Sequence, residues 1–215
     1  MKKVRNRVCL LFLVISCSVS AQQTDLQSWN SLRISKKIHK RTTLSLKEGI
    51  RFRENISLIS KYFTDIKISH RIKKTDFSFA IGYRFSNNYD IDFSKEMQSR
   101  YYLDFISKYD YKRYEVTLRD RLQYQGNDHT IYKPLYRQKI DLAYNIRKTS
   151  LEPSIACEYF INFKGNFEKM RYTISFSYDL LNDLDLDVYY RVQQELNAAD
   201  PSTLYILGSS VSYKL

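Results

Sequence analysis

The segment from Ile66 to Phe85 alternates apolar and polar residues with a period of two. Its second half places bulky apolar side chains at every other position, namely Phe77, Phe79, Ile81, Tyr83 and Phe85. Because successive strand residues point to opposite faces, the segment predicts a β-hairpin that turns at residues 73–76 and has a single apolar face. In a soluble sandwich that face would point inward, whereas in a membrane barrel it would point outward to lipid.

The same alternation recurs along the chain, where we count eleven strand segments separated alternately by short turns and longer loops. Segments of about ten to twelve residues are near the span of a tilted membrane strand and longer than most strands of soluble sheets. This layout is typical of an all-β, up-and-down antiparallel transmembrane barrel, and a Greek-key sandwich does not need it. Since bacterial barrels usually have an even number of strands, we expect about twelve, with ten as the alternative.

The chain also repeats itself, since segment 34–48 resembles segment 106–120 in the order of its apolar and basic residues. Glu48 and Asp120 interrupt the apolar rows at matching points of the two segments. We expect a shared feature at these acids: a β-bulge, a strand end or a pairing site.

Residues 1–21 have the layout of a cleavable signal peptide, with a basic start, the apolar run Val8 to Ser16 and the small residues Val19-Ser20-Ala21. A buried first helix is one alternative, and lipidation at Cys17 after Val14-Ile15-Ser16 is another. We therefore expect an exported protein with residues 22–215 as its barrel domain. Its net charge would be +8, from 31 basic and 23 acidic residues, because the signal removes four basic residues.

The mature chain has one cysteine, Cys157, so a disulfide framework is excluded. It has no apolar run of about 18 residues, which excludes a transmembrane helix. Tyrosine is abundant, with 19 residues, and favours both strands and membrane interfaces. These features suit a barrel, in which only every second residue meets lipid.

The faces opposite the apolar rows carry many charges, and turning them outward would leave too many bulky apolar side chains for the interior of a soluble barrel. We therefore expect apolar rows toward lipid, including Phe77, Phe79, Ile81, Tyr83, Phe85, Ile174, Phe176 and Tyr178. We expect a network of paired charges in the lumen, formed by Lys47, Arg51, Arg53, Asp65, Arg71, Arg84, Arg100, Asp104, Glu115, Arg119, Arg121, Arg137, Asp141 and Asp187.

The last strand resembles the C-terminal signal that the barrel-assembly machinery reads, carried here by Gly208, Val211, Tyr213 and Leu215. The early Trp29, the charged and aromatic strand 118–124 and the segment Ile81-Gly82-Tyr83-Arg84-Phe85 add a wider likeness. Over the mature chain the sequence resembles the outer-membrane β-barrel family known as domain of unknown function 2490 (DUF2490), common in Bacteroidetes-like bacteria. The resemblance implies a barrel in a Gram-negative outer membrane and implies no activity.

The chain shows no pattern for a metal, a cofactor or a catalytic triad, so we expect neither cofactor nor enzymatic activity. His39, His70 and His129 lack metal-ligand spacing. The basic residues alternate with acids along strands, which argues against nucleic acid as a partner. The expected partners are outer-membrane lipid, lipopolysaccharide phosphates at the outer rim and the assembly machinery, with the protein a monomer.

The functional expectation is a structural or narrow-pore, transport-like (porin-like) barrel with a charged lumen. One alternative is a soluble periplasmic barrel that binds an apolar ligand. Another is an outer-membrane lipid hydrolase or acyltransferase, which would need His70 or His129 beside a serine and a carboxylate.

Overall fold

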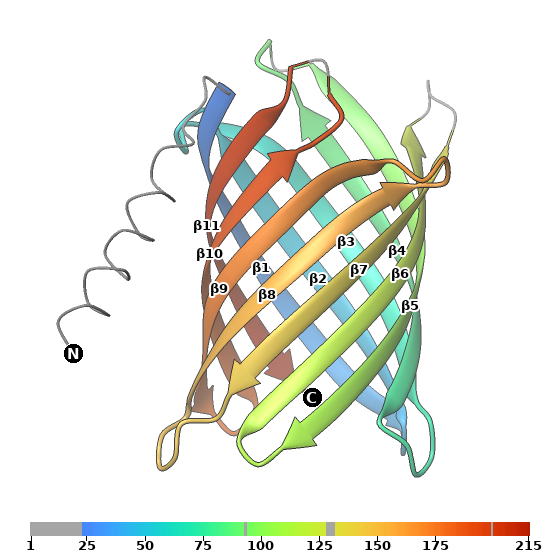
Figure 1. Ribbon diagram of the computed structural model, residues 1–215, viewed down its shortest axis with the longest axis vertical. Coiled ribbons are helices and arrows are strands. Elements are labelled where there is room, and N and C mark those ends of the chain that lie inside the picture. The colour runs from blue at the N-terminus through green and yellow to red at the C-terminus, as the bar shows by residue number, and fades with distance from the viewer. Residues whose placement is uncertain (1–22, 93, 128–131, 199) are drawn as a thin grey trace, which may run out of the picture.

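The computed structural model describes residues 23–92, 94–127, 132–198 and 200–215 as a β-barrel (Figure 1). The proposed signal peptide, the Cys17 alternative and His129 lie outside these residues. A membrane-spanning helix is absent from the described part of the chain. The strands are β1 (Gln23–His39), β2 (Thr42–Arg53), β3 (Leu58–Arg71), β4 (Phe77–Tyr89), β5 (Lys95–Tyr111), β6 (Tyr114–Asn127), β7 (Lys133–Tyr144), β8 (Leu151–Asn162), β9 (Phe167–Leu181), β10 (Leu184–Glu195) and β11 (Ser202–Lys214).

The sheet of described strands closes with eleven members, so the expectation of twelve strands, or ten, was wrong. Each strand pairs antiparallel with the next, and β1 pairs with β11 in parallel. Up-and-down strands alternate in direction, so the first and last of an odd set run the same way. The ring can therefore close only through a parallel pair, which the even-number expectation did not allow.

The odd count fits the internal repeat. Strands β1, β5 and β9 begin at residues 23, 95 and 167, at equal intervals of 72 residues. The first two units each contain four strands, and the third contains the three strands β9, β10 and β11. The barrel is thus two complete units and one that is a strand shorter.

The apolar rows lie on the outside of the barrel. Ile81 and Ile174, in the middle parts of β4 and β9, are 59% and 51% exposed. Phe77, Phe79, Phe176 and Tyr178 are also exposed, and Tyr83 and Phe85 are half-exposed. The opposite faces are turned inward and hold the buried charges. The alternative of a soluble barrel with an apolar interior requires the reverse arrangement.

Glu48 and Asp120 both lie on the outer face, within strands and without a register shift at either residue. The hydroxyl of Thr64 donates to Glu48 at 3.0 Å, and the amide of Gln138 and the hydroxyl of Tyr136 donate to Asp120. Of the three expected features, the bulge and the strand end were wrong. Each acid is instead a cross-strand pairing site, which satisfies a carboxylate on an apolar face.

The two ends of the barrel differ in charge. The short turns at one end, near the C-terminus in Figure 1, contain eight exposed basic residues and two acids: Lys40, Arg41, Lys73, Lys74, Lys112, Arg113, Arg147 and Lys148, with Asp76 and Asp183. The described loops at the other end contain one lysine and four acids. One of these acids is Asp92, whose pKa is held below its usual value by hydrogen bonds from Ser94.

Three glycines on inward faces each receive an aromatic ring from the neighbouring strand. Gly49 lies opposite Phe63, Gly82 opposite Tyr102, and Gly208 opposite Tyr189. A Cβ at any of the three would lie 2.1–2.3 Å from that ring. Each ring therefore fills the space that a side chain would take at the glycine. This arrangement fixes the register of the two strands.

We predict that Gly82→Val lowers the free energy of unfolding by about 1–3 kcal/mol, because it overpacks the Tyr102 ring. Urea unfolding in lipid vesicles measures this cost. In a Tyr102→Ala background the cost should shrink, since the ring that clashes is gone. An equal cost in both backgrounds would show that Tyr102 is not the cause.

Candidate functional site: a basic lumen

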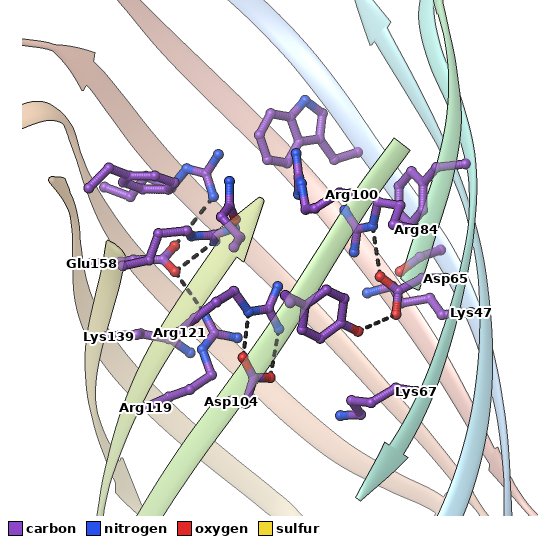
Figure 2. Close-up of a pocket in the computed structure, with 18 of the residues that line it drawn as sticks. Lys47, Asp65, Lys67, Arg84, Arg100, Asp104, Arg119, Arg121, Lys139 and Glu158 are labelled. Carbon is purple, nitrogen blue, oxygen red and sulfur yellow. Dashed lines mark hydrogen bonds and ion pairs between the residues drawn. The ribbon is translucent and has the colours of Figure 1, made fainter. Parts of the chain in front are cut away.

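A cavity of about 460 Å³ lies inside the barrel and is lined by residues of most strands (Figure 2). Its lining contains thirteen basic residues and four acids. The basic residues are Arg33, Lys47, Arg51, Lys67, Arg84, Arg100, Arg119, Arg121, Arg137, Lys139, Lys169, Arg171 and Arg191, and the acids are Asp65, Asp104, Glu158 and Glu168. The lining therefore has an excess of nine positive charges, and cannot be a balanced network of pairs.

Three of the four acids of the lumen wall form ion pairs with basic neighbours, namely Asp65, Asp104 and Glu158. Asp65 accepts from Arg84 Nε at 2.8 Å and from the Tyr102 hydroxyl at 2.7 Å (Figure 2). Asp104, only 3% exposed, accepts two hydrogen bonds from the guanidinium of Arg121. This fork-to-carboxylate contact is the strongest type of ion pair in proteins.

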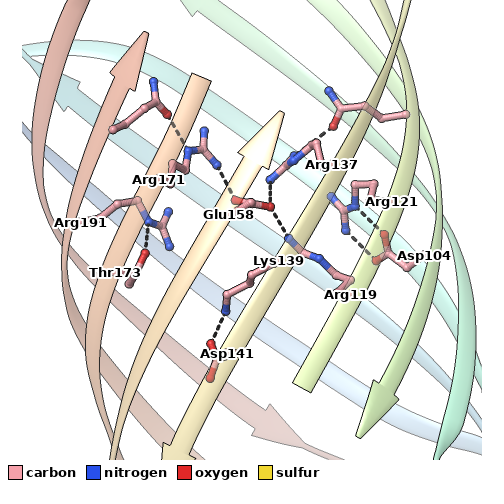
Figure 3. Close-up of polar contacts among 12 residues, drawn as sticks. Asp104, Arg119, Arg121, Arg137, Lys139, Asp141, Glu158, Arg171, Thr173 and Arg191 are labelled. Atoms are coloured by element: carbon pink, nitrogen blue, oxygen red, sulfur yellow. Dashed lines mark hydrogen bonds and ion pairs between the residues drawn. The ribbon is translucent and has the colours of Figure 1, made fainter. Parts of the chain in front are cut away.

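Glu158 is the most heavily shared acid. Its carboxylate accepts from Arg119 at 2.6 Å, from Arg137 at 2.7 Å and from Arg171 at 3.3 Å (Figure 3). These residues come from four neighbouring strands, β6 to β9, and Glu158 is 6% exposed. One negative charge thus holds three positive ones together across the wall.

Aromatic rings also contact the guanidinium groups of the lumen, both of arginines that have an acidic partner and of Arg51, which has none among the described residues. Arg51 lies 3.6 Å above the Trp29 ring, and Arg84 lies 4.0 Å from the ring centre of Phe63. Arg121 is stacked on Tyr102 at 3.8 Å. Ring faces attract cations, so these contacts stabilise guanidinium groups without neutralising their charge.

Several cations of the lining have no anionic partner within the described residues. Arg33, Lys47 and Lys67 have neither a side-chain hydrogen bond nor an ion pair there, and Arg51 has only ring contacts. Arg100 and Arg191 are hydrogen-bonded only to the neutral groups of Gln125 and Thr173. The lumen therefore presents cationic groups toward its open space.

Comparison with known proteins places the chain in a family. A model of the family described as "Protein of unknown function (DUF2490)" matches residues 26–203. The chain belongs to the DUF2490 family. The resemblance seen in the sequence is thereby confirmed, and the barrel is a DUF2490 barrel. Among curated proteins, no sequence matches the chain.

The fold is also similar to that of a solved autotransporter domain. The crystal structure of the β domain of the Bordetella autotransporter BrkA aligns with a TM-score of 0.50 and 8% sequence identity. The alignment covers 80% of this chain and 82% of that chain. At this identity the likeness concerns the fold alone, which is an all-β barrel of the outer-membrane type.

Nine of the fourteen residues expected in the DUF2490 lumen line the cavity: Lys47, Arg51, Asp65, Arg84, Arg100, Asp104, Arg119, Arg121 and Arg137. The other five lie outside it, and four of them form local contacts. Arg53 pairs with Asp90, Glu115 with Lys108, Asp141 with Lys139, and Asp187 with the hydroxyl of Ser177, while Arg71 is exposed at the end of β3. These five lie toward the ends of their strands, where the lumen opens.

Sequence reasoning did not select several residues of the lining as a site. Glu158 and Arg171 lie on the charged faces but were not chosen, although they form the centre of the network. The inward aromatic residues Trp29, Phe63 and Tyr189 were missed as well. A usable signal was present: each is a large ring at a position whose strand neighbours two residues away are polar or charged.

Of the residues expected to form a C-terminal assembly signal, Gly208, Val211 and Tyr213 lie in β11, at the seam with β1, and Leu215 follows it. Gly208 faces Trp29 in the pairing, Val211 faces Leu32 and Tyr213 faces Ile34. The backbone N–H of Leu215 donates to the carbonyl of Ser35 at 2.7 Å. These residues thus close the ring as well as end the chain.

His70, which the hydrolase alternative would need, makes only local contacts within the described residues. His70 shares a hydrogen bond with Thr42 at 3.0 Å and its ring is tilted against Phe79, and within the described residues no serine or carboxylate is hydrogen-bonded to it. No group of three or more metal-ligating side chains occurs within the described ranges. The hydrolase alternative therefore finds no triad at His70.

Proposed function

We propose that the protein is an outer-membrane barrel that forms a narrow, anion-preferring pore without enzymatic activity. The observation that carries this proposal is the lumen lining, with thirteen basic residues against four acids. A cationic passage with low-dielectric walls concentrates anions and repels cations. The eight basic residues in the short turns extend the same field to one mouth of the barrel.

The closely packed middle layer supports a small conductance. Tyr102, Phe160, Arg121 and Arg137 are all buried within the lumen. Their side chains leave a cavity rather than a wide channel. The passage we propose is therefore suited to small anions and not to large solutes.

We propose that the exposed apolar rows contact outer-membrane lipid. We also propose that the barrel-assembly machinery recognises the last strand. Lipopolysaccharide contact at the loop end has less support. The described loops there carry four acids and one lysine, and the basic excess is at the turn end.

The test is the reversal potential of the mature protein in a planar bilayer with a gradient of potassium chloride. We predict a chloride-to-potassium permeability ratio above one. Arg191→Glu should lower the ratio, because it adds a carboxylate to the lumen lining. Lys40→Glu changes the net charge equally in an exposed turn at the mouth, where salt screens it more strongly, and should lower the ratio by less. A preference for potassium, or the absence of current, would contradict the proposal.

A further inference from the structure

Three cations on adjacent strands form a distinct group in the lumen wall, and we call them the cation triplet: Arg33 of β1, Lys47 of β2 and Lys67 of β3. Arg33 lies directly opposite Lys47 in the pairing of β1 with β2. Lys67 lies opposite Ser45 in the pairing of β2 with β3. Ser45 is two residues from Lys47 on the same face of β2, so Lys67 is a diagonal neighbour of Lys47. All three line the cavity. Like charges directly opposite each other in a sheet destabilise it, so the triplet requires compensation.

Within the described residues the compensation is incomplete, because Asp65 and Asp104 attract the two lysines through space but form no ion pair or hydrogen bond with them. The nearest acid in register is Asp65, opposite Lys47, and both of its oxygens are used by Arg84 and Tyr102. Both carboxylate oxygens of Asp104 likewise accept hydrogen bonds from the guanidinium of Arg121. In Figure 2 no interaction reaches the ammonium groups of Lys47 or Lys67. An anion from solution would supply the compensation that the wall lacks.

We propose that the cation triplet is a binding site for a phosphate-type oxyanion, either inorganic phosphate or the terminal phosphate of a phosphomonoester. A phosphate dianion offers several acceptor oxygens and close to two charges, which three cations can match. The guanidinium of Arg33 provides a planar fork for two of the oxygens, and the two lysines provide mobile point charges. Chloride has one charge and no directional acceptors, so it satisfies fewer of these donors.

This inference rests on the proposed function and deepens it, because it gives the pore a preferred anion and a binding site for that anion. The two can fail separately. If the barrel conducts chloride in preference to potassium but does not bind phosphate, the proposed pore stands and the proposed phosphate site is wrong.

The experiment is calorimetric titration of inorganic phosphate into the folded, full-length mature protein in detergent, at constant ionic strength in chloride. Lys47→Gln is compared with Lys139→Gln. Both remove one positive charge from the lining, but Lys139 is already paired with Asp141 at 2.5 Å. We expect Lys47→Gln to weaken phosphate binding about tenfold or more, the size of one lost charge-assisted contact, and Lys139→Gln to weaken it less than about twofold.

Two outcomes overturn the site. One is the absence of phosphate binding by the unaltered barrel. The other is an equal loss in both variants, which would mean that only the total lumen charge matters. If Lys47→Gln does not fold, Arg33→Gln replaces it with the same expected loss. A second titration, with glycerol 3-phosphate, then shows whether a phosphomonoester or inorganic phosphate binds more tightly.

Discussion

Replacing Glu158 with glutamine is expected to lower the free energy of unfolding by about 3–5 kcal/mol, the largest effect of any single substitution considered for this barrel. The change keeps the shape of the side chain and removes its charge. Arg119, Arg137 and Arg171 then lose their shared carboxylate, and three guanidinium groups are left repelling one another in a buried wall. Urea unfolding in vesicles measures the loss, and added chloride should recover part of it because salt screens the repulsion.

The matched control is Glu115→Gln. Glu115 also forms a pair, with Lys108 at 2.6 Å, but both side chains are partly exposed at the turn end of the barrel. Exposed pairs contribute about 0–1 kcal/mol, so this variant should unfold nearly as the unaltered protein does. Equal losses for the two glutamates would show that Glu158 is not a special centre of the network.

The second large effect concerns the outer face. Ile174→Lys places a charge in the middle of β9 on the apolar side, where we expect a loss of about 2–4 kcal/mol in lipid vesicles. Ser175→Lys is the control, because it is the next residue and faces the interior, where Ser154 is its partner. The inward lysine should cost much less, since Ser175 lies outside the cationic cavity lining and Glu152 and Asp187 are its diagonal neighbours on the adjacent strands. A larger loss for Ser175→Lys than for Ile174→Lys would mean that the faces of the strand are reversed.

The strands and their faces were predictable from the sequence for a simple physical reason. A strand between lipid and an aqueous lumen must alternate strictly, so the row from Phe77 to Phe85 identifies both faces at once. Glycine is scarce, and the polar turn at residues 73–76 separates β3 from β4 as expected. Eleven strands could also be counted in the sequence. The prediction of twelve came only from the general rule that bacterial barrels have an even number of strands.

The pairing within the lumen was not predictable, because it depends on which residues meet across the wall. The sequence shows that Asp65 and Arg84 are inward, and their pairing follows only from the register of β3 with β4. Glu158 binds Arg119, two strands away, a contact that no spacing in the sequence reveals. The full excess of positive charge likewise emerges only after Arg33, Lys169 and Arg191, which were not among the expected lumen residues, are placed in the cavity lining.

The central claim is that apolar rows face lipid and ionic rows face an enclosed lumen, and the fluorescence of Trp29 tests it most directly. Trp29 is the only tryptophan of the chain and is 6% exposed, with Arg51 stacked on its ring inside the barrel. In vesicles of lipids with brominated acyl chains, its emission should be nearly unquenched. In the double variant Trp29→Phe with Phe176→Trp, the indole lies on the outer face and should be strongly quenched. Strong quenching of Trp29 together with weak quenching of the introduced indole would contradict the account.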